Sequence, residues 1–137
     1  MSVTELEPSP VKAVPLTPEK GLLLEAIGVL KRRGWYQGAL VEPAHLATGP
    51  VCALGAIYVA SRGESPFARG GGIVHLKWDI EPALGELRAI DALSKAIDCE
   101  MAIGHDVMAP WLIGSWNDGA DRTVEDVVAA FRKAIES

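Results

Sequence analysis

The chain has 137 residues, of which 49% are hydrophobic and 23% charged, with a net charge of −5 and a pI near 5.1. This size and composition are typical of one globular domain with a buried core, not of a disordered chain. The acidic balance argues against a phosphate-backbone partner, since nucleic-acid-binding proteins present a basic face. We therefore expect no nucleic acid as a partner.

Sequence pattern excludes further classes of protein. The two cysteines, Cys52 and Cys99, form no CxxC pair, which excludes a zinc ribbon and a thioredoxin-like motif. The N-terminus lacks the basic and apolar regions of a signal peptide, and no apolar run reaches the roughly 18 residues of a membrane span. We expect a cytoplasmic protein with reduced, buried cysteines, no cofactor and no membrane association.

The first predicted helix follows a proline-containing stretch. Residues 1–16 are expected to form a flexible N-terminal arm, and residues 17–137 a single helical domain. Thr17 suits the N-cap, and Pro18 suits the first helical position. Gly34 suits the C-terminal cap, directly after three cationic residues that favour the negative end of the helix.

Three more helices are predicted further along the chain. Residues 51–63 are apolar nearly all round, which indicates a buried helix, and Gly55 at its centre suggests a close helix–helix contact. Residues 83–102 carry apolar residues at helical spacing. The last helix begins at Thr123, whose capping box is completed by Asp126. Between these two helices, residues 103–116 are expected to form a loop with one short helical turn.

Two stretches permit short strands, one near residues 39–41 and one in the alternating segment "IVHLKW". The predicted fold class is therefore mainly α: a compact single domain of about four helices with long Gly- and Pro-containing loops, and one small β-hairpin as an option.

Three short motifs together resemble a known family. They are "WYQG", with Gln37 and Gly38; "CALGA", starting at Cys52; and "WND" followed by an Arg-Thr pair, from Trp116 to Thr123. In this combination the chain resembles a family of small proteins of unknown function from actinobacteria and their phages. The resemblance covers roughly residues 17–135 and implies a bacterial or phage-encoded protein. It implies no activity.

One set of polar residues is a candidate ligand site: Trp116, Asn117, Asp118, Arg122 and Gln37. A guanidinium beside an indole could bind a small anionic ligand such as a nucleotide. The alternative is structural, with Trp116 in the core, Asp118 accepting from turn amides and Arg122 paired with a neighbouring aspartate. We favour the structural interpretation.

Other candidate chemistry is weaker. Cys52 with His45, His75 or His105, together with Asp106, contains the parts of a cysteine hydrolase, but an apolar helix raises a thiol pKa. A metal site built from the two cysteines with His75 and His105 matches no ligand spacing, so we predict no metal. The "ARGGGI" loop at Arg69 lacks a P-loop pattern.

Aromatic residues in the predicted loops, Trp35, Tyr36, Trp78 and Trp111, are candidate interface anchors. No catalytic motif is present, so an enzyme is not favoured. The leading hypothesis is a non-enzymatic binding or regulatory protein that acts by contact with a host protein or by self-association as a homodimer. Binding of a small anionic ligand is the alternative, and a cysteine-dependent hydrolase ranks third.

Overall fold

The computed structural model describes residues 16–63, 68–69, 72–73, 83–101 and 109–137. The described residues form five helices: α1 (Pro18–Arg33), α2 (Ala53–Arg62), α3 (Leu84–Met101), α4 (Ala109–Asn117) and α5 (Val124–Glu136). Two short strands, β1 (Ala68–Arg69) and β2 (Gly72–Ile73), pair antiparallel, with Ala68 opposite Ile73. The fold is mainly helical, as predicted.

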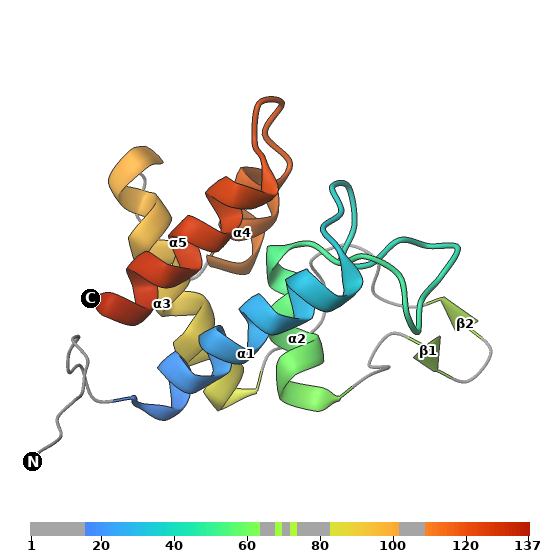
Figure 1. Cartoon of the computed structure of the whole chain (residues 1–137), viewed down its shortest axis with the longest axis horizontal. Helices are drawn as coiled ribbons and strands as arrows, with labels where there is room; N and C mark the ends of the chain where they lie inside the picture. The colour runs from blue at the N-terminus through green and yellow to red at the C-terminus, as the bar shows by residue number, and fades with distance from the viewer. Residues whose placement is uncertain (1–15, 64–67, 70–71, 74–82, 102–108) are drawn as a thin grey trace, which may run out of the picture.

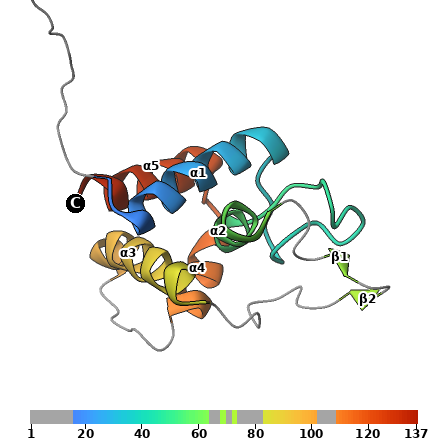
Figure 2. The same ribbon diagram turned by 90° about the horizontal axis from the view of Figure 1, so that it is seen from below.

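The helices pack in two levels (Figures 1 and 2). Helices α1 and α5 lie side by side on one side of the molecule, with α3 and α4 beneath them, and α2 packs against α1. All five helices contribute to one buried core, which includes Leu23, Leu30, Leu54, Ile57, Tyr58, Ile90, Leu93, Ile97, Ile113, Trp116, Val127 and Phe131. Burial of these apolar side chains is the main force that holds the two levels together.

Helix ends follow the capping signals in the sequence. The Thr17 side chain accepts a hydrogen bond from the Lys20 amide, and Gly34 ends α1 with a φ of 95°. At α5, the Thr123 hydroxyl accepts from the Asp126 amide while the Asp126 carboxylate accepts from the Thr123 amide. The predicted caps of both helices are thus confirmed, because local hydrogen bonding alone fixes them.

Helix α4 corrects the prediction of about four helices. The sequence predicts a loop with one short helical turn over residues 103–116, because Gly104, Pro110 and Gly114 interrupt the segment. In the structure, Pro110 is the second residue of the helix, where its missing N–H costs nothing. Gly114 is buried within the helix, where apolar packing offsets its low propensity.

The strand expected near residues 39–41 is present only as an isolated bridge, and its pairing with the second expected strand falls on residues outside those described. Val41 makes an isolated antiparallel bridge with Val51, and Trp35 makes a parallel bridge with the same residue. The β1–β2 pair lies elsewhere in the sequence, and most of the "IVHLKW" segment lies outside the described residues. The predicted arm, residues 1–16, lies outside them as well, except for Leu16.

Gly55 is required by a close backbone contact. A Cβ atom there would lie 2.1 Å from the carbonyl oxygen of Leu40. The expected close approach is therefore present, but to the loop after α1 and not to another helix. The same loop carbonyl accepts a hydrogen bond from the Cys52 amide, at 3.1 Å.

Within the described ranges, none of the helices is both long and apolar enough to cross a bilayer.

Candidate functional site

Asn117, the last residue of α4, is fully buried and joins three segments of the chain. Its Oδ1 accepts hydrogen bonds from Nε1 of Trp35, at 2.7 Å, and from the backbone amide of Ala53, at 2.9 Å. Its Nδ2 donates to the Tyr36 carbonyl, at 3.0 Å, and to Oδ1 of Asp118, at 3.1 Å. Both lone pairs and both N–H groups of the amide are therefore used within the chain.

Two neighbours extend these contacts toward the surface. Gln37 Nε2 donates to the carbonyls of Asn117 and Gly119, each at 3.0 Å. The Gly38 amide, at a residue with a φ of 107°, donates to Oδ1 of Asp118 at 2.9 Å. Asp118 thus accepts a backbone amide from another loop, whereas the structural interpretation predicted amides of its own turn as the donors. We call the contacts around Asn117 the Asn117 junction.

Arg122 lies against Trp116 on the other side of this turn. Its Nε donates to the Trp116 carbonyl at 2.9 Å, and its guanidinium carbon lies 4.2 Å from the centroid of the indole. This stacking is a cation–π contact. Trp116 is buried in the core, as predicted, and its Nε1 has no hydrogen-bond partner in the part of the chain that is described.

Cys52 is the N-cap of α2, and its thiol is a structural group. Its Sγ accepts a hydrogen bond from the Gly55 amide at 3.2 Å, and the residue is fully buried. Burial raises the pKa of the Cys52 thiol to about 12. A nucleophile needs an accessible thiolate, so these properties argue against a cysteine hydrolase.

Most of the remaining catalytic and metal candidates lie outside the described residues. His45 is exposed and contacts the neighbouring carboxylate of Glu42, with 2.6 Å between Nδ1 and Oε1. No group of three metal-ligating side chains occurs among residues that are described. His75, His105, Asp106, Trp78 and the side chains of Cys99 and Trp111 lie outside them, as does the side chain of Arg69.

A groove runs along the solvent side of the α1–α5 contact, and no pattern in the sequence predicts it. One hollow of about 670 Å³ lies between the end of α1 and the start of α5, and is lined by Leu30, Gly34, Trp35, Val124, Glu125, Val128 and Ala129, with Lys31 and Arg132. A second, of about 380 Å³, adds Leu24, Ile27, Gly28, Ile135 and Glu136. Because both hollows are lined by Lys31 and Arg132, we treat them as one feature, the α1–α5 groove.

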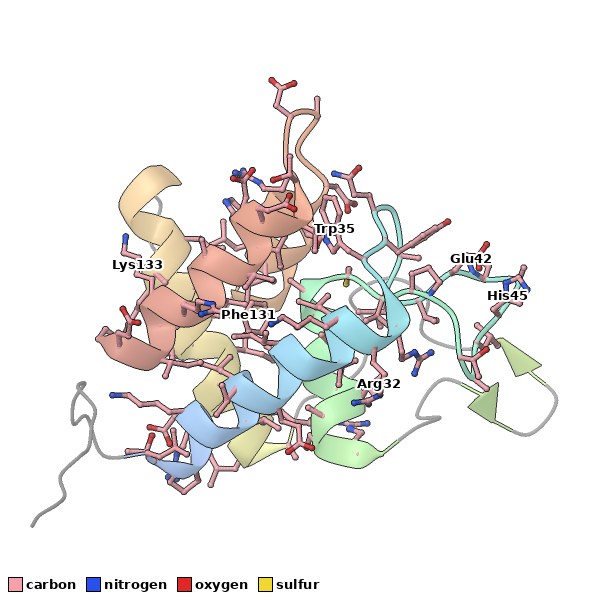
Figure 3. All side chains as sticks on the ribbon, viewed as in Figure 1. Arg32, Trp35, Glu42, His45, Phe131 and Lys133 are labelled. Carbon is pink, nitrogen blue, oxygen red and sulfur yellow. The ribbon has the colours of Figure 1, made fainter. Side chains whose placement is uncertain are left out.

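Trp35 belongs to both the groove and the junction. It is half-buried and lies just beyond the last turn of α1 (Figure 3). It also lines the first hollow. Its N–H is bound to Asn117, so the indole is fixed in place. Tyr36, the next interface candidate, is also half-buried, and its carbonyl accepts from Asn117. The structure thus brings Gln37, Asn117, Asp118 and Trp35 together.

An ion pair between Arg62 of α2 and the buried Glu86 of α3 also had no sequence signal. Arg62 donates to both carboxylate oxygens of Glu86, at 2.6 and 2.7 Å, although Glu86 is only 1% exposed. Burial would by itself raise the pKa of Glu86. Hydrogen bonds from Arg62, the Ala83 amide and Ser61 outweigh it and hold the pKa below its usual value.

The fold and these contacts define a small, mainly helical protein in which the three sequence motifs meet at one buried junction. The model of the family of unknown function DUF6197 matches residues 15–137, and the chain belongs to this family. Neither the curated proteins nor the solved structures contain a match to the chain.

Proposed function

We propose that this protein is a non-enzymatic binding protein whose protein partner docks in the α1–α5 groove. The observation that carries the proposal is the α1–α5 groove itself. It is largely apolar, it lies on an outer face, and Trp35 at one end of it is held by a hydrogen bond. Water-exposed apolar surface is costly unless it is covered, and such patches commonly mark interaction sites.

Trp35 supports this assignment because it has the properties of an interface anchor. Tryptophan is enriched among residues that dominate binding energy. The hydrogen bond from Nε1 of Trp35 to Asn117 already holds the ring in the free protein. A partner would therefore lose little additional side-chain entropy at this position when it binds.

The Asn117 junction is a less suitable place for a small anionic ligand. The amide of Asn117 has no unused donor or acceptor, and Gln37 Nε2 already contacts two carbonyls. Arg122 is likewise engaged with the Trp116 carbonyl and ring. We therefore assign the junction a structural role, which is to position Trp35.

An actinobacterial or phage source and a cytoplasmic location stay as predictions from the sequence.

Site-specific photocrosslinking tests this proposal directly. A photoreactive residue at Leu24, which is 51% exposed in the groove, should give a discrete protein adduct when the protein is expressed in an actinobacterial host. The matched control is Leu87 on α3, which is 42% exposed and does not line the groove. Equal adducts at both positions, or none at Leu24, would overturn the proposal.

A groove-filling variant provides the second arm. A Cβ atom at Gly28 would meet nothing within 4 Å and Gly28 lines the groove, so the side chain of Gly28→Phe starts in open space on the groove side of α1. Gly85 on α3 is equally open, which makes Gly85→Phe the matched control. The Leu24 adduct should disappear in Gly28→Phe and persist in Gly85→Phe.

A further inference from the structure

We propose that the occupant of the α1–α5 groove is an amphipathic helix of another protein that carries a carboxylate in the middle of its apolar face. This inference rests on the proposed function and specifies the chemistry of the partner. The length of the groove, its floor and its charges each contribute to it.

The groove has the length of a short helix. Its lining residues on α5 run from Val124 to Glu136, which corresponds to roughly 18 Å at about 1.5 Å per residue. On α1 they run from Leu24 past the end of the helix to Trp35. Three helical turns of a partner would fit this span, with apolar anchors at positions i, i+4 and i+7.

The floor of the groove allows a helix to approach closely. Gly28 on α1 has open space where a Cβ would lie, and Ala129 on α5 is exposed. Each hollow is also lined by larger apolar side chains. These are Trp35 and Val128 in the first hollow and Leu24 and Ile135 in the second. Two apolar anchors of a partner helix could therefore fill the two hollows.

The charges at the middle of the groove select the partner. Lys31 and Arg132 line both hollows, and neither has a hydrogen bond or an ion pair to another described residue. Both are exposed in a protein whose net charge is −5. A helix that covered two cations without neutralising them would incur a desolvation penalty, so a central carboxylate is the complementary group.

The same charges disfavour a second copy of this chain as the occupant. In a symmetric dimer, a two-fold axis through the middle of the groove brings identical residues together. Lys31 and Arg132 of one copy would then face Lys31 and Arg132 of the other. The acidic lining residues, Glu125 and Glu136, each belong to only one of the hollows and not to both. Such like-charge contacts destabilise a symmetric pairing of two copies.

A displayed peptide library tests the inference. The library consists of helical peptides with leucine fixed at i, i+4 and i+7, and with Glu, Lys, Gln or Ser at the other positions. The wild-type protein should enrich peptides with Glu near the central leucine. The double variant Lys31→Glu, Arg132→Glu should enrich Lys there instead, and should bind the wild-type winners at least about tenfold more weakly.

Four results would overturn the inference. Enrichment without a charge preference, or no enrichment by the wild type, removes the acidic helix but leaves the proposed function intact if Leu24 still forms its adduct. A dimer in light scattering that Gly28→Phe dissociates makes a second copy the occupant. If the enriched peptides bind Gly28→Phe with the same affinity as Gly85→Phe, they occupy another surface. That result contradicts both the inference and the proposed docking site.

Discussion

Trp35 donates a 2.7 Å hydrogen bond from its indole N–H to Oδ1 of Asn117, and this contact joins the end of α1 to the end of α4 across 82 residues. The acceptor is fully buried, and its amide has no unused hydrogen-bonding group. The position of Trp35 in the groove therefore depends on a residue near the other end of the chain.

Asn117→Ala should lower the free energy of unfolding by about 3 kcal/mol, because it leaves the Trp35 indole and the Ala53 amide without their acceptor. Urea denaturation followed by circular dichroism measures this change. Ser115→Ala, on the same helix, serves as the control and should stay within about 0.5 kcal/mol of wild type. An Asn117→Ala variant as stable as the control would contradict the structural role of the junction.

Two glycine-to-alanine substitutions should have opposite effects on stability. Gly55→Ala should destabilise by roughly 1–3 kcal/mol, because its Cβ would lie 2.1 Å from the Leu40 carbonyl oxygen. Gly28→Ala meets no atom within 4 Å and should stabilise α1 by about 0.5–1 kcal/mol. Melting temperatures of the two variants give the comparison, and a loss of stability in Gly28→Ala would show that the groove floor is not open.

The free energy of unfolding should decrease at acidic pH, because Glu86 becomes protonated. Its pKa is lowered in the folded protein, so its contribution is fully present above the pKa of the unfolded chain and is lost as pH falls through the folded pKa. Glu86→Gln should lower stability at neutral pH by on the order of 2–3 kcal/mol, since Arg62 loses its ionic partner. It should also flatten the acid limb of the curve of unfolding free energy against pH. An unchanged acid limb in the variant would assign that limb to other carboxylates.

Cys52 should resist alkylation until the protein unfolds. The side chain is fully buried, and a pKa of about 12 leaves almost no thiolate at pH 8. Treatment with iodoacetamide, followed by mass spectrometry of the Cys52 peptide, should show modification only in urea. Rapid labelling of the native protein would instead restore the nucleophile hypothesis.

Local signals in the sequence predicted the helices whose ends are fixed by nearby residues. Thr17 and Thr123 mark the starts of α1 and α5, because a cap needs only the amides of the next turn. Pro110 misled the prediction for α4, since proline either breaks a helix or begins one, and only packing decides between them. The ion pair of Arg62 with the buried Glu86 had no sequence signal, because a glutamate in a first turn is also typical of an exposed helix start.

The members of the junction could be named from the sequence, but their partners could not. Gln37 and Asn117 lie 80 residues apart, and no local pattern predicts that they are in contact. The groove is harder to predict from the sequence, because it depends on how α1 and α5 pack. The one local indication is Leu24, an apolar residue that lies outside the core stripe of Leu23, Ile27 and Leu30.

The Asn117 junction also affects the order in which the chain folds. The Ala53 amide in the first turn of α2 takes its acceptor from a residue 64 positions later, so α1 and α2 leave the ribosome before that acceptor has been made. Contacts of such high sequence separation slow folding, because loop-closure entropy is lost before they form. The amide hydrogens of Gly38 and Ala53, whose acceptors are the side chains of Asp118 and Asn117, should therefore gain protection from exchange late, after α4 has reached its place. The hydrogen bond that holds the Trp35 indole also forms only at that step.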